Sequence, residues 1–451
     1  MAISRRKFIE SSAMLGVGVS LSSSTWSRGS AGSRPALLGG QPVFVRKEWP
    51  RWPAWQPATD EKHVIEVLRS GVWSRAAIVK RFETRWAEVI GTKRCLTVVN
   101  GTNALITALG NFNVGPGDEV IIPPYTFVAT VMAVLANGAM PVFADVEPDT
   151  FQIDPQKVEE KITPRTKAII PVHIAGLPAD MDRIMSVARK HNLVIIEDAC
   201  QAHLASYGGK RVGSIGDAGC FSFQNSKNLP IGEGGAIVSD QVEFMDRCFS
   251  YHNLGLPYGS MVGSVSVGSV MVGTKTRFTE YQAAIGLALM ERLASETDKR
   301  DQNARYLSDM LRHVPGIHPA RLYDKVTKGA FHLYPFRYDR TAFSGLSRER
   351  FIEALRAEGV PCSPGYAVLT DQPFLKSAFE SPLYQRFYPA ASLDFEAYRL
   401  ANECPNNEML CNQEAVWFTQ NMLLGTKTDM EMIASAITRI QKSSAQLANA
   451  N

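Results

Sequence analysis

One lysine of the sequence lies where it could hold a carbonyl cofactor. Lys227 follows an apolar run (219–223) and three polar residues, and a glycine cluster (232–235) comes soon after it. An amine at the end of a buried strand costs free energy unless it is neutralised or bonded, and imine formation with an aldehyde does this. The glycines would let backbone pass close to a cofactor or a neighbouring chain. The run is typical of a lysine that carries pyridoxal phosphate, although a surface lysine in a turn would look similar.

An acidic residue ends an earlier apolar run. Asp198 directly follows the apolar run at residues 193–197. A pyridoxal ring needs a carboxylate near its ring nitrogen, because the anion keeps that nitrogen protonated and lets the ring accept electrons. Two strand ends could bring Asp198 and Lys227 to face each other across an open sheet. The ordinary alternative is a helix N-cap after a strand.

Three further positions could complete a cofactor site. Gly101 and Thr102 lie between an apolar run (95–99) and a helical pattern, and helix N-termini bind phosphate through free N–H groups. Ser222 would add a second hydroxyl. Phe127 follows a strand-like run (119–122) and could stack on a planar ring. A capped helix and a core aromatic are the ordinary alternatives, but the order along the chain favours a cofactor site.

Alternating short apolar runs and helical patterns must position these residues. The expected strands are 95–99, 119–122, 141–143, 168–172, 193–197, 219–223 and 235–238, and the helices between them include 104–112, 127–137 and 181–191. This alternation predicts an α/β domain with a mostly parallel sheet sandwiched by helices. We predict an extended Pro- and Trp-rich arm and a large cofactor-binding domain over 34–310. A smaller α+β domain is predicted over 311–451.

Together these motifs identify a family resemblance. The chain resembles the DegT/DnrJ/EryC/StrS aminotransferases, which have the fold type I architecture of pyridoxal-phosphate enzymes. The likeness covers roughly 36–440 and includes 117–127, 141–146, 163–173, 197–203, 221–229 and 277–284. It implies that Lys227 binds the cofactor and moves protons, Asp198 pairs with the pyridine nitrogen, and Phe127 stacks on the ring. It further implies that the phosphate is held by Gly101, Thr102 and Ser222 and that Gln201 lies near the ring hydroxyl.

The resemblance also implies a reaction. Such an enzyme would move an amino group from glutamate or glutamine to a keto sugar or keto cyclitol, by a ping-pong mechanism through an aldimine on Lys227. The segments 221–224 and 232–235 are especially similar to the keto-inositol branch. Related dehydratases have histidine in place of the lysine, so Lys227 favours transamination. A sugar dehydratase and a non-catalytic cofactor-binding sensor of the same fold stay open as alternatives.

Members of this family are homodimers with the site at the interface, which implies a contribution from the partner copy. The stretch 273–277 would then reach the partner's phosphate through Lys275 and Arg277. Many relatives read Gly-Tyr-Asn-Tyr-Arg there, whereas this chain reads Gly-Thr-Lys-Thr-Arg. Lys275 thus replaces an asparagine, and the detail of that contact is open.

Composition and termini limit the remaining choices. A net charge of +4 without a dense basic run argues against a nucleic-acid partner. The seven cysteines include no C-x-x-C pair, so neither a zinc site nor a disulfide framework is predicted. No apolar run is long enough for a stable membrane span. Arg5, Arg6 and Phe8 precede a short, weakly apolar stretch, which predicts a twin-arginine signal over 1–33 and export to the periplasm. A flexible tail on a cytoplasmic enzyme is the alternative.

Overall fold

The computed structural model describes residues 34–45, 48–261 and 266–450. The expected twin-arginine segment lies outside these residues. The described residues belong to one compact unit. Within the described part of the chain, no helix combines the length and the apolar composition that crossing a membrane requires.

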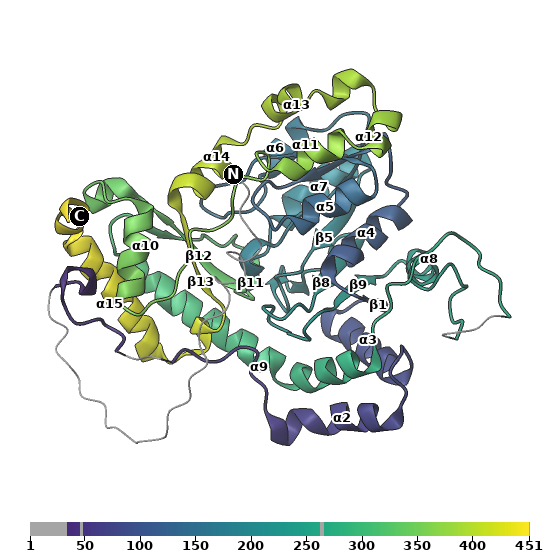
Figure 1. Cartoon of the computed structure of the whole chain (residues 1–451), viewed down its shortest axis with the longest axis horizontal. Coiled ribbons are helices and arrows are strands. Elements are labelled where there is room, and N and C mark those ends of the chain that lie inside the picture. Colours follow the sequence, from purple (N-terminus) through teal and green to yellow (C-terminus); the bar gives the residue numbers. More distant parts are fainter. Residues whose placement is uncertain (1–33, 46–47, 262–265, 451) are drawn as a thin grey trace. The chain divides into compact units, whose positions relative to one another are not determined.

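A seven-stranded sheet forms the centre of the molecule (Figure 1). Its strands are β1 (Arg94–Val98), β2 (Glu119–Ile122), β3 (Met140–Phe143), β4 (Thr166–Ile169), β5 (Val194–Asp198), β8 (Ala218–Ser222) and β9 (Gly235–Ser239). The spatial order is β1-β9-β8-β5-β4-β2-β3, and only β9 runs antiparallel to its neighbours. The prediction of a mostly parallel sheet is confirmed.

Helices cover both faces of this sheet. One core contains residues of α3 (Ala77–Ile90), α7 (Met181–His191) and α9 (Glu280–Leu311). The other contains residues of α4 (Gly101–Asn111), α5 (Ala129–Ala136) and α8 (Val242–His252). Successive strand residues point to opposite faces, so Ile195 belongs to the first core and Ile196 to the second. Burial on both faces explains why the strands are continuously apolar.

The long helix α9 connects the large sheet to a second, smaller one. Thr279 and Gln282 form a capping box at its start, and α9 packs on α3 and on the C-terminal helix α15 (Lys427–Lys442). The smaller antiparallel sheet contains β10 (Ile317–Pro319), β12 (Leu333–Tyr338) and β13 (Ala415–Thr419), and α10 (Arg348–Ala357) and α15 share its core. This is the expected α+β part. The expected boundary between the two domains, at residues 310 and 311, lies at the end of α9. The division into these two domains stays a prediction.

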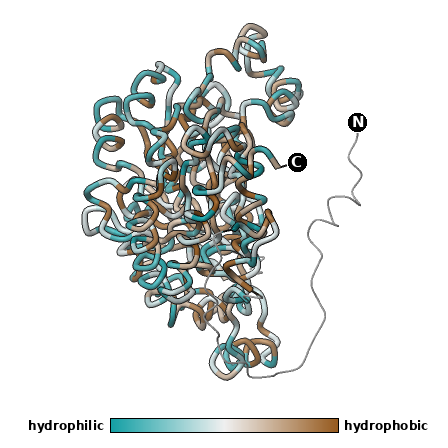
Figure 2. Tube along the Cα trace, turned by 90° about the vertical axis from the view of Figure 1, so that its left-hand side faces the viewer, coloured by the Kyte–Doolittle hydropathy of each residue, from teal (hydrophilic) through white to brown (hydrophobic). Residues whose placement is uncertain are grey.

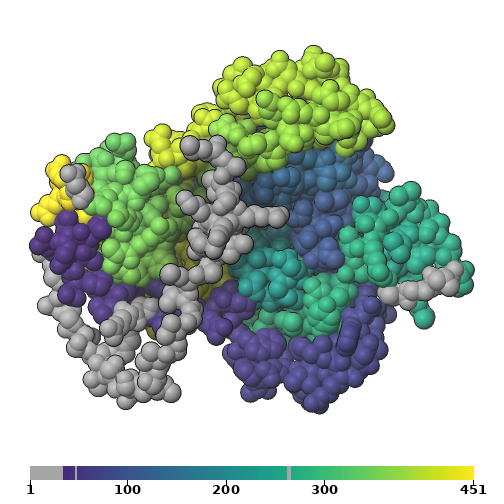
Figure 3. Space-filling view, in the orientation of Figure 1, coloured from purple at the N-terminus to yellow at the C-terminus, as the bar shows by residue number. Residues whose placement is uncertain are grey.

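Part of the C-terminal segment packs on the large sheet instead. Figure 1 shows three yellow-green helices, α11 (Pro373–Phe379), α12 (Pro382–Phe387) and α13 (Phe395–Ala401), above the blue elements of the first sheet. In the space-filling view of Figure 3 the yellow-green atoms border the blue ones. Tyr384 donates from its hydroxyl to the carbonyl of Ala139 at 2.6 Å. Tyr398 donates likewise to the carbonyl of Pro141 at 2.8 Å. These contacts join the segment to the strand at the sheet's edge, an arrangement that the sequence pattern did not indicate.

The other elements are short or peripheral. In the coloured part of the trace in Figure 2, hydrophobic and hydrophilic stretches alternate, as expected when short elements each bury one side. The remaining elements are α2 (Pro57–Ser70), α6 (Pro155–Glu160), α14 (Pro405–Met409), α16 (Ser444–Asn449), β6 (Ser206–Tyr207), β7 (Lys210–Arg211), β11 (Val326–Lys328), η1 (Ala36–Leu38), η2 (Ile174–Gly176), η3 (Arg340–Phe343), η4 (Ala390–Leu393), η5 (Leu410–Glu414) and η6 (Met422–Leu424).

Candidate active site

Lys227 lies in the loop between β8 and β9, at the sheet edge where β5 also ends. Its backbone N–H donates to the carbonyl of Gln224 at 2.8 Å, and its side chain is half-buried. Burial lowers the pKa of Lys227 below that of a free lysine, whereas nearby Cys200 and Asp198 act to raise it. Burial therefore favours the neutral amine, which is the form that attacks a carbonyl.

Asp198 is the last residue of β5 and is only 5% exposed. The Thr130 hydroxyl donates to its Oδ2 at 2.8 Å, and the Cys200 N–H donates to its Oδ1 at 3.2 Å. Thr130 in turn shares a hydrogen bond of 2.9 Å with the hydroxyl of Thr126. A carboxylate bonded at both oxygens keeps one orientation, so Asp198 can present a fixed negative charge to a cationic partner.

The turn at Gly101 approaches the end of β8 very closely. Asn100 caps α4 by accepting from the N–H of Asn103 at 2.8 Å, and the first N–H groups of any helix lack partners within it. A Cβ on Gly101 would lie 2.8 Å from both Cys200 Sγ and Ser222 Cβ. Glycine is therefore required there, and the helix start and Ser222 together form a cradle suited to an anion.

Gly235, the last glycine of the cluster after Lys227, also lies very close to the turn at Gly101. A Cβ on Gly235 would lie 2.4 Å from the carbonyl carbon and oxygen of Asn100. Gly235 therefore lets β9 pack against the turn that precedes α4. The close neighbour of Gly235 is thus the chain's own backbone, and the expected approach to a cofactor or a neighbouring chain stays a prediction.

Phe127 and Gln201 border the same region. Phe127 lies just before Val128, the N-cap of α5, and is 55% exposed, so the alternative of a core aromatic is wrong. Gln201 is buried; its Oε1 accepts from the Ala175 N–H at 2.9 Å, and its Nε2 donates to the Tyr366 hydroxyl at 2.9 Å. Both amide atoms are thus used in holding the side chain, and Tyr366 is brought to the site from the C-terminal part of the chain.

Lys275 and Arg277 behave differently from the other predicted residues. Backbone pairing places Arg277 opposite Val98, just before the turn at Gly101. The side chain of Lys275 is exposed, and the Arg277 guanidinium donates to Asn253 Oδ1 at 3.2 Å. Across the described residues no hydrogen bond joins Arg277 to Lys227 or Asp198. The part that Lys275 and Arg277 play in phosphate binding therefore stays a prediction.

Sequence reasoning missed two residues that hold the site. Thr130 lies one helical turn after Phe127, and that spacing was a signal that could have placed its hydroxyl at the same end of the sheet. Tyr366 lies in a loop far along the chain and carries no local signal. Glu197, by contrast, points away from the site and accepts from the N–H groups of Gly213 and Ile215 at 2.8 and 2.7 Å. Of the adjacent acidic pair, only Asp198 can therefore serve a cofactor.

The residues fit pyridoxal phosphate. A glycine turn without room for a Cβ, a helix N-terminus and Ser222 suit the phosphate, and an exposed aromatic face suits the ring. Asp198 suits the ring nitrogen, and the half-buried Lys227 suits the aldehyde. Among the described residues no cluster of histidine, cysteine, aspartate or glutamate side chains could hold a metal ion.

Comparison with known proteins agrees with this geometry. The family model of the DegT/DnrJ/EryC1/StrS aminotransferase family matches residues 56–391. L-glutamine:2-deoxy-scyllo-inosose aminotransferase of Streptoalloteichus tenebrarius is 33% identical over 430 residues, which cover 91% of this chain and 98% of that protein. Spore coat polysaccharide biosynthesis protein SpsC of Bacillus subtilis is 36% identical over 339 residues, which cover 74% and 85%. The crystal structure of 3-amino-5-hydroxybenzoic acid synthase, 29% identical, matches with a TM-score of 0.75 and covers 87% of this chain and 98% of that one.

Proposed function

The chain belongs to the DegT/DnrJ/EryC1/StrS aminotransferase family and is a pyridoxal-phosphate-dependent aminotransferase, and we propose that it transfers an amino group from glutamine to the ketone of a cyclitol. One observation carries the proposal: Lys227 and Asp198 lie at one edge of the sheet, beside the Gly101 turn. The relative from Streptoalloteichus tenebrarius is named for a glutamine donor and a keto cyclitol, and it matches along almost its whole length. A keto sugar is the second acceptor class.

Each residue of the site has a separate task. When bound, pyridoxal phosphate supplies an electron-accepting ring and a carbonyl that can be exchanged for an amino group. The amine of Lys227 takes up and returns protons, because burial favours its neutral form. Asp198, oriented by Thr130 and the Cys200 N–H, would supply the negative charge that a protonated ring nitrogen requires. Gly101 and Ser222 would bind the phosphate and so set the position of everything attached to it.

Reductive trapping of the cofactor on its lysine and half-reactions with candidate ketones test this assignment. Borohydride reduction of the loaded protein, followed by peptide mass spectrometry, should place the reduced cofactor on Lys227. Lys227→Ala should abolish both trapping and turnover, while Lys62→Ala, an exposed lysine of α2, should change neither. The protein in its amino form should then be mixed with keto inositols and keto sugars. Return of the aldehyde absorption with keto inositols identifies the acceptor class.

The same half-reactions separate the alternatives. A sensor would bind the cofactor without converting it when glutamine is added, and a dehydratase would consume a sugar without returning the aldehyde form. Lys227 with the Asp198 carboxylate beside it supports the aminotransferase, because a sensor has no need of an electron-accepting ring held in this way. An unchanged spectrum with glutamine would contradict the proposal.

We also propose that two copies associate to complete the site. The face around Val72 and Trp73 carries large exposed apolar side chains, among them Met261, which is 80% exposed. Apolar surface of this kind marks an association site more often than free surface. Ser74 pairs with Thr279, so this face continues directly to the stretch that holds Lys275 and Arg277. A partner seated here would have these two cations within reach for its phosphate.

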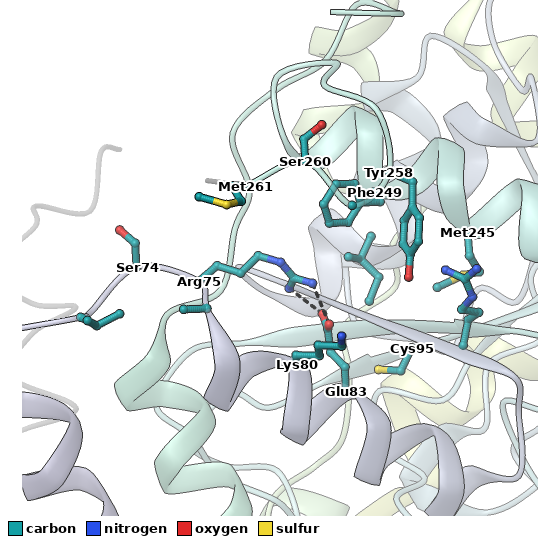
Figure 4. A pocket seen from close by; sticks show the side chains of 15 residues that line it. Ser74, Arg75, Lys80, Glu83, Cys95, Met245, Phe249, Tyr258, Ser260 and Met261 are labelled. Atoms are coloured by element: carbon teal, nitrogen blue, oxygen red, sulfur yellow. Dashed lines mark hydrogen bonds and ion pairs between the residues drawn. The ribbon is translucent and has the colours of Figure 1, made fainter. Parts of the chain in front are cut away.

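A cavity of about 640 Å³ opens on the same face (Figure 4). It is lined in part by Val72, Tyr258 and Met261 and does not include Lys227. Figure 4 shows Arg75 directed at Glu83, whose carboxylate accepts from the guanidinium at 2.6 and 2.7 Å. The charges of Arg75 and Glu83 are thus paired with each other, and the exposed apolar side chains of Val72 and Met261 at the cavity suit a protein surface.

Export is a further proposal. Arg5, Arg6 and Phe8, followed by a weakly apolar stretch, support a twin-arginine signal that would carry the folded, cofactor-loaded protein to the periplasm. A cyclitol or sugar ketone would then have to be present in that compartment.

A further inference from the structure

The segment before α2 is bonded to several distant parts of the chain. The N–H groups of Ala36 and Val43 donate to the two carboxylate oxygens of Glu358 at 2.9 and 2.8 Å. Further along, Asn421 donates from Nδ2 to the carbonyl of Pro50 at 2.8 Å. The segment is therefore held along the C-terminal part before it reaches the large sheet.

At Trp52 this segment touches the loop that carries the reactive lysine. The Trp52 indole Nε1 donates to the carbonyl oxygen of Lys227 at 3.1 Å. On its ring lies the guanidinium of Arg300, with Cζ 4.8 Å from the ring centroid. A single side chain thus joins the arm, the lysine loop and α9.

Arg300 is a rigid support for that ring. Its side chain is completely buried, and its Nε donates to Gln420 Oε1 at 2.7 Å. A buried guanidinium bonded in this way has few alternative positions, and cation–π attraction holds the indole against it. Arg300 therefore holds the Trp52 indole in the orientation in which its N–H points to the Lys227 carbonyl.

The hydrogen bond from Trp52 is made to the backbone carbonyl of Lys227 itself. The other backbone bond of Lys227 runs from its N–H to Gln224, inside the same loop. The next residue, Asn228, donates from its side chain to the carbonyl of Ala330 at 2.7 Å. The indole bond thus connects the peptide after Lys227 to a fixed element outside the loop. A rotation of that peptide would swing the amine, and small displacements of a reacting group lower rates strongly.

We propose that Trp52 is a positioning residue for Lys227. Held by Arg300, its indole N–H fixes the Lys227 carbonyl and with it the place and surroundings of the amine. The inference rests on the proposed role of Lys227 as the cofactor lysine. It gives the N-terminal arm a part in the chemistry that its sequence alone does not suggest.

Trp52→Phe tests the hydrogen bond while keeping a ring under Arg300. The matched control is Trp55→Phe, because Trp55 is exposed and its Nε1 donates to the nearby Glu61 at 3.4 Å. In the full-length, cofactor-free protein, the reactivity of the Lys227 amine is measured by competitive acetylation and mass spectrometry across a pH series. Hydrogen–deuterium exchange of the peptide over 224–230 and the melting temperature are recorded beside it.

We expect Trp52→Phe to change the labelling rate of Lys227 by about two- to tenfold, the range given by loss of one ordinary hydrogen bond. Exchange in the loop should speed up, with little change in melting temperature. Trp55→Phe should match the unaltered protein in the labelling rate of Lys227 and in the exchange of the loop. Gln420→Leu, which removes the bond to Arg300 Nε and leaves Glu296 as its ion-pair partner, should act in the same direction as Trp52→Phe and tests the proposal if Trp52→Phe does not fold. Unaltered labelling and exchange in the folded variants would overturn the proposal.

Reductive trapping on the unaltered protein keeps this outcome separate from the role of Lys227. If the cofactor is trapped on another lysine, the assignment of Lys227 fails. Labelling and exchange then still report whether Trp52 controls the lysine loop. If trapping succeeds on Lys227 and Trp52→Phe has no effect on labelling or exchange, only the positioning role is lost.

Discussion

The Thr130 hydroxyl lies 2.8 Å from Asp198 Oδ2 and connects the helix that follows Phe127 to the strand that ends at the acidic residue. The helix that presents the exposed aromatic therefore also orients the carboxylate. Ring stacking and charge pairing would in this way share one support, so a change at Thr130 should be felt at the cofactor without any contact to it.

Thr130→Val should lower kcat/KM by about ten- to a hundredfold. The valine keeps the shape but removes a hydrogen bond to a charged group, which is worth about 1.5–3 kcal/mol. Steady-state kinetics with glutamine measure the loss. Thr107→Val is the control, since Thr107 is buried on α4 and its hydroxyl has no hydrogen-bond partner within the described chain. Equal kinetics in the two variants would remove Thr130 from the site.

Asp198→Asn should keep the fold and lower the rate by about a hundredfold or more, as removal of a major electrostatic stabiliser does. An amide cannot hold a positive charge on a ring nitrogen, and its single oxygen can accept only one of the two bonds that Thr130 and the Cys200 N–H donate to the carboxylate. Single-turnover rates with glutamine measure the effect, and circular dichroism checks the fold. A rate within about threefold of the unaltered enzyme contradicts the assigned role.

How much the sequence could predict depends on how local the cause is. The strand that ends at Asp198 and the turn at Gly101 follow from apolar runs and a capped helix start, each set by neighbours in the chain. The indole contact of Trp52 and the hydroxyl contact of Tyr366 join residues more than a hundred positions apart. Such contacts are fixed by how the whole chain packs, so no local pattern indicates them.

Stability of the cofactor-free protein should depend on pH through Lys227. Burial lowers its pKa in the folded state from the ordinary value of 10.5, although Asp198 and Cys200 oppose the shift. Below the lowered pKa both states carry the proton, and the folded state bears the full penalty of a buried charge. As pH rises from that pKa toward 10.5 the unfolded chain holds more protons, so stability increases.

Lys227→Met should remove this penalty. The variant should be more stable than the unaltered protein near neutral pH, and the difference should shrink as pH rises toward 10.5. Chemical denaturation at several pH values gives the two free energies of unfolding. Lys62→Met, at an exposed position, should show no such pH-dependent difference. A difference that grows with pH would mean that burial is not what governs this lysine.

Replacement of Arg5 and Arg6 by lysine should retain the protein in the cytoplasm, because twin-arginine export depends on that pair. Cell fractionation and mass spectrometry of the mature N-terminus measure the outcome, with cleavage expected near residue 30. A replacement of Lys7 alone serves as the control and should leave export intact. Recovery of the unaltered protein only from the cytoplasm, with residues 1–33 attached, would leave the tail without an export role.

Mixing two inactive variants should restore activity if the partner copy supplies Arg277. Lys227→Ala disables the copy's own lysine, and Arg277→Ala would disable the phosphate contact made to the partner. In a mixed dimer one site carries both defects and the other carries none, so subunit exchange at equal amounts should recover about one quarter of the unaltered activity. Lys227→Ala mixed with Asp198→Asn is the control, because each copy then keeps its own defect and no intact site forms. No recovery in the first mixture, despite mixed dimers seen by native mass spectrometry, would place Arg277 in its own copy's site or outside any site. Recovery in the control mixture would show that the restored activity does not report on the partner's Arg277.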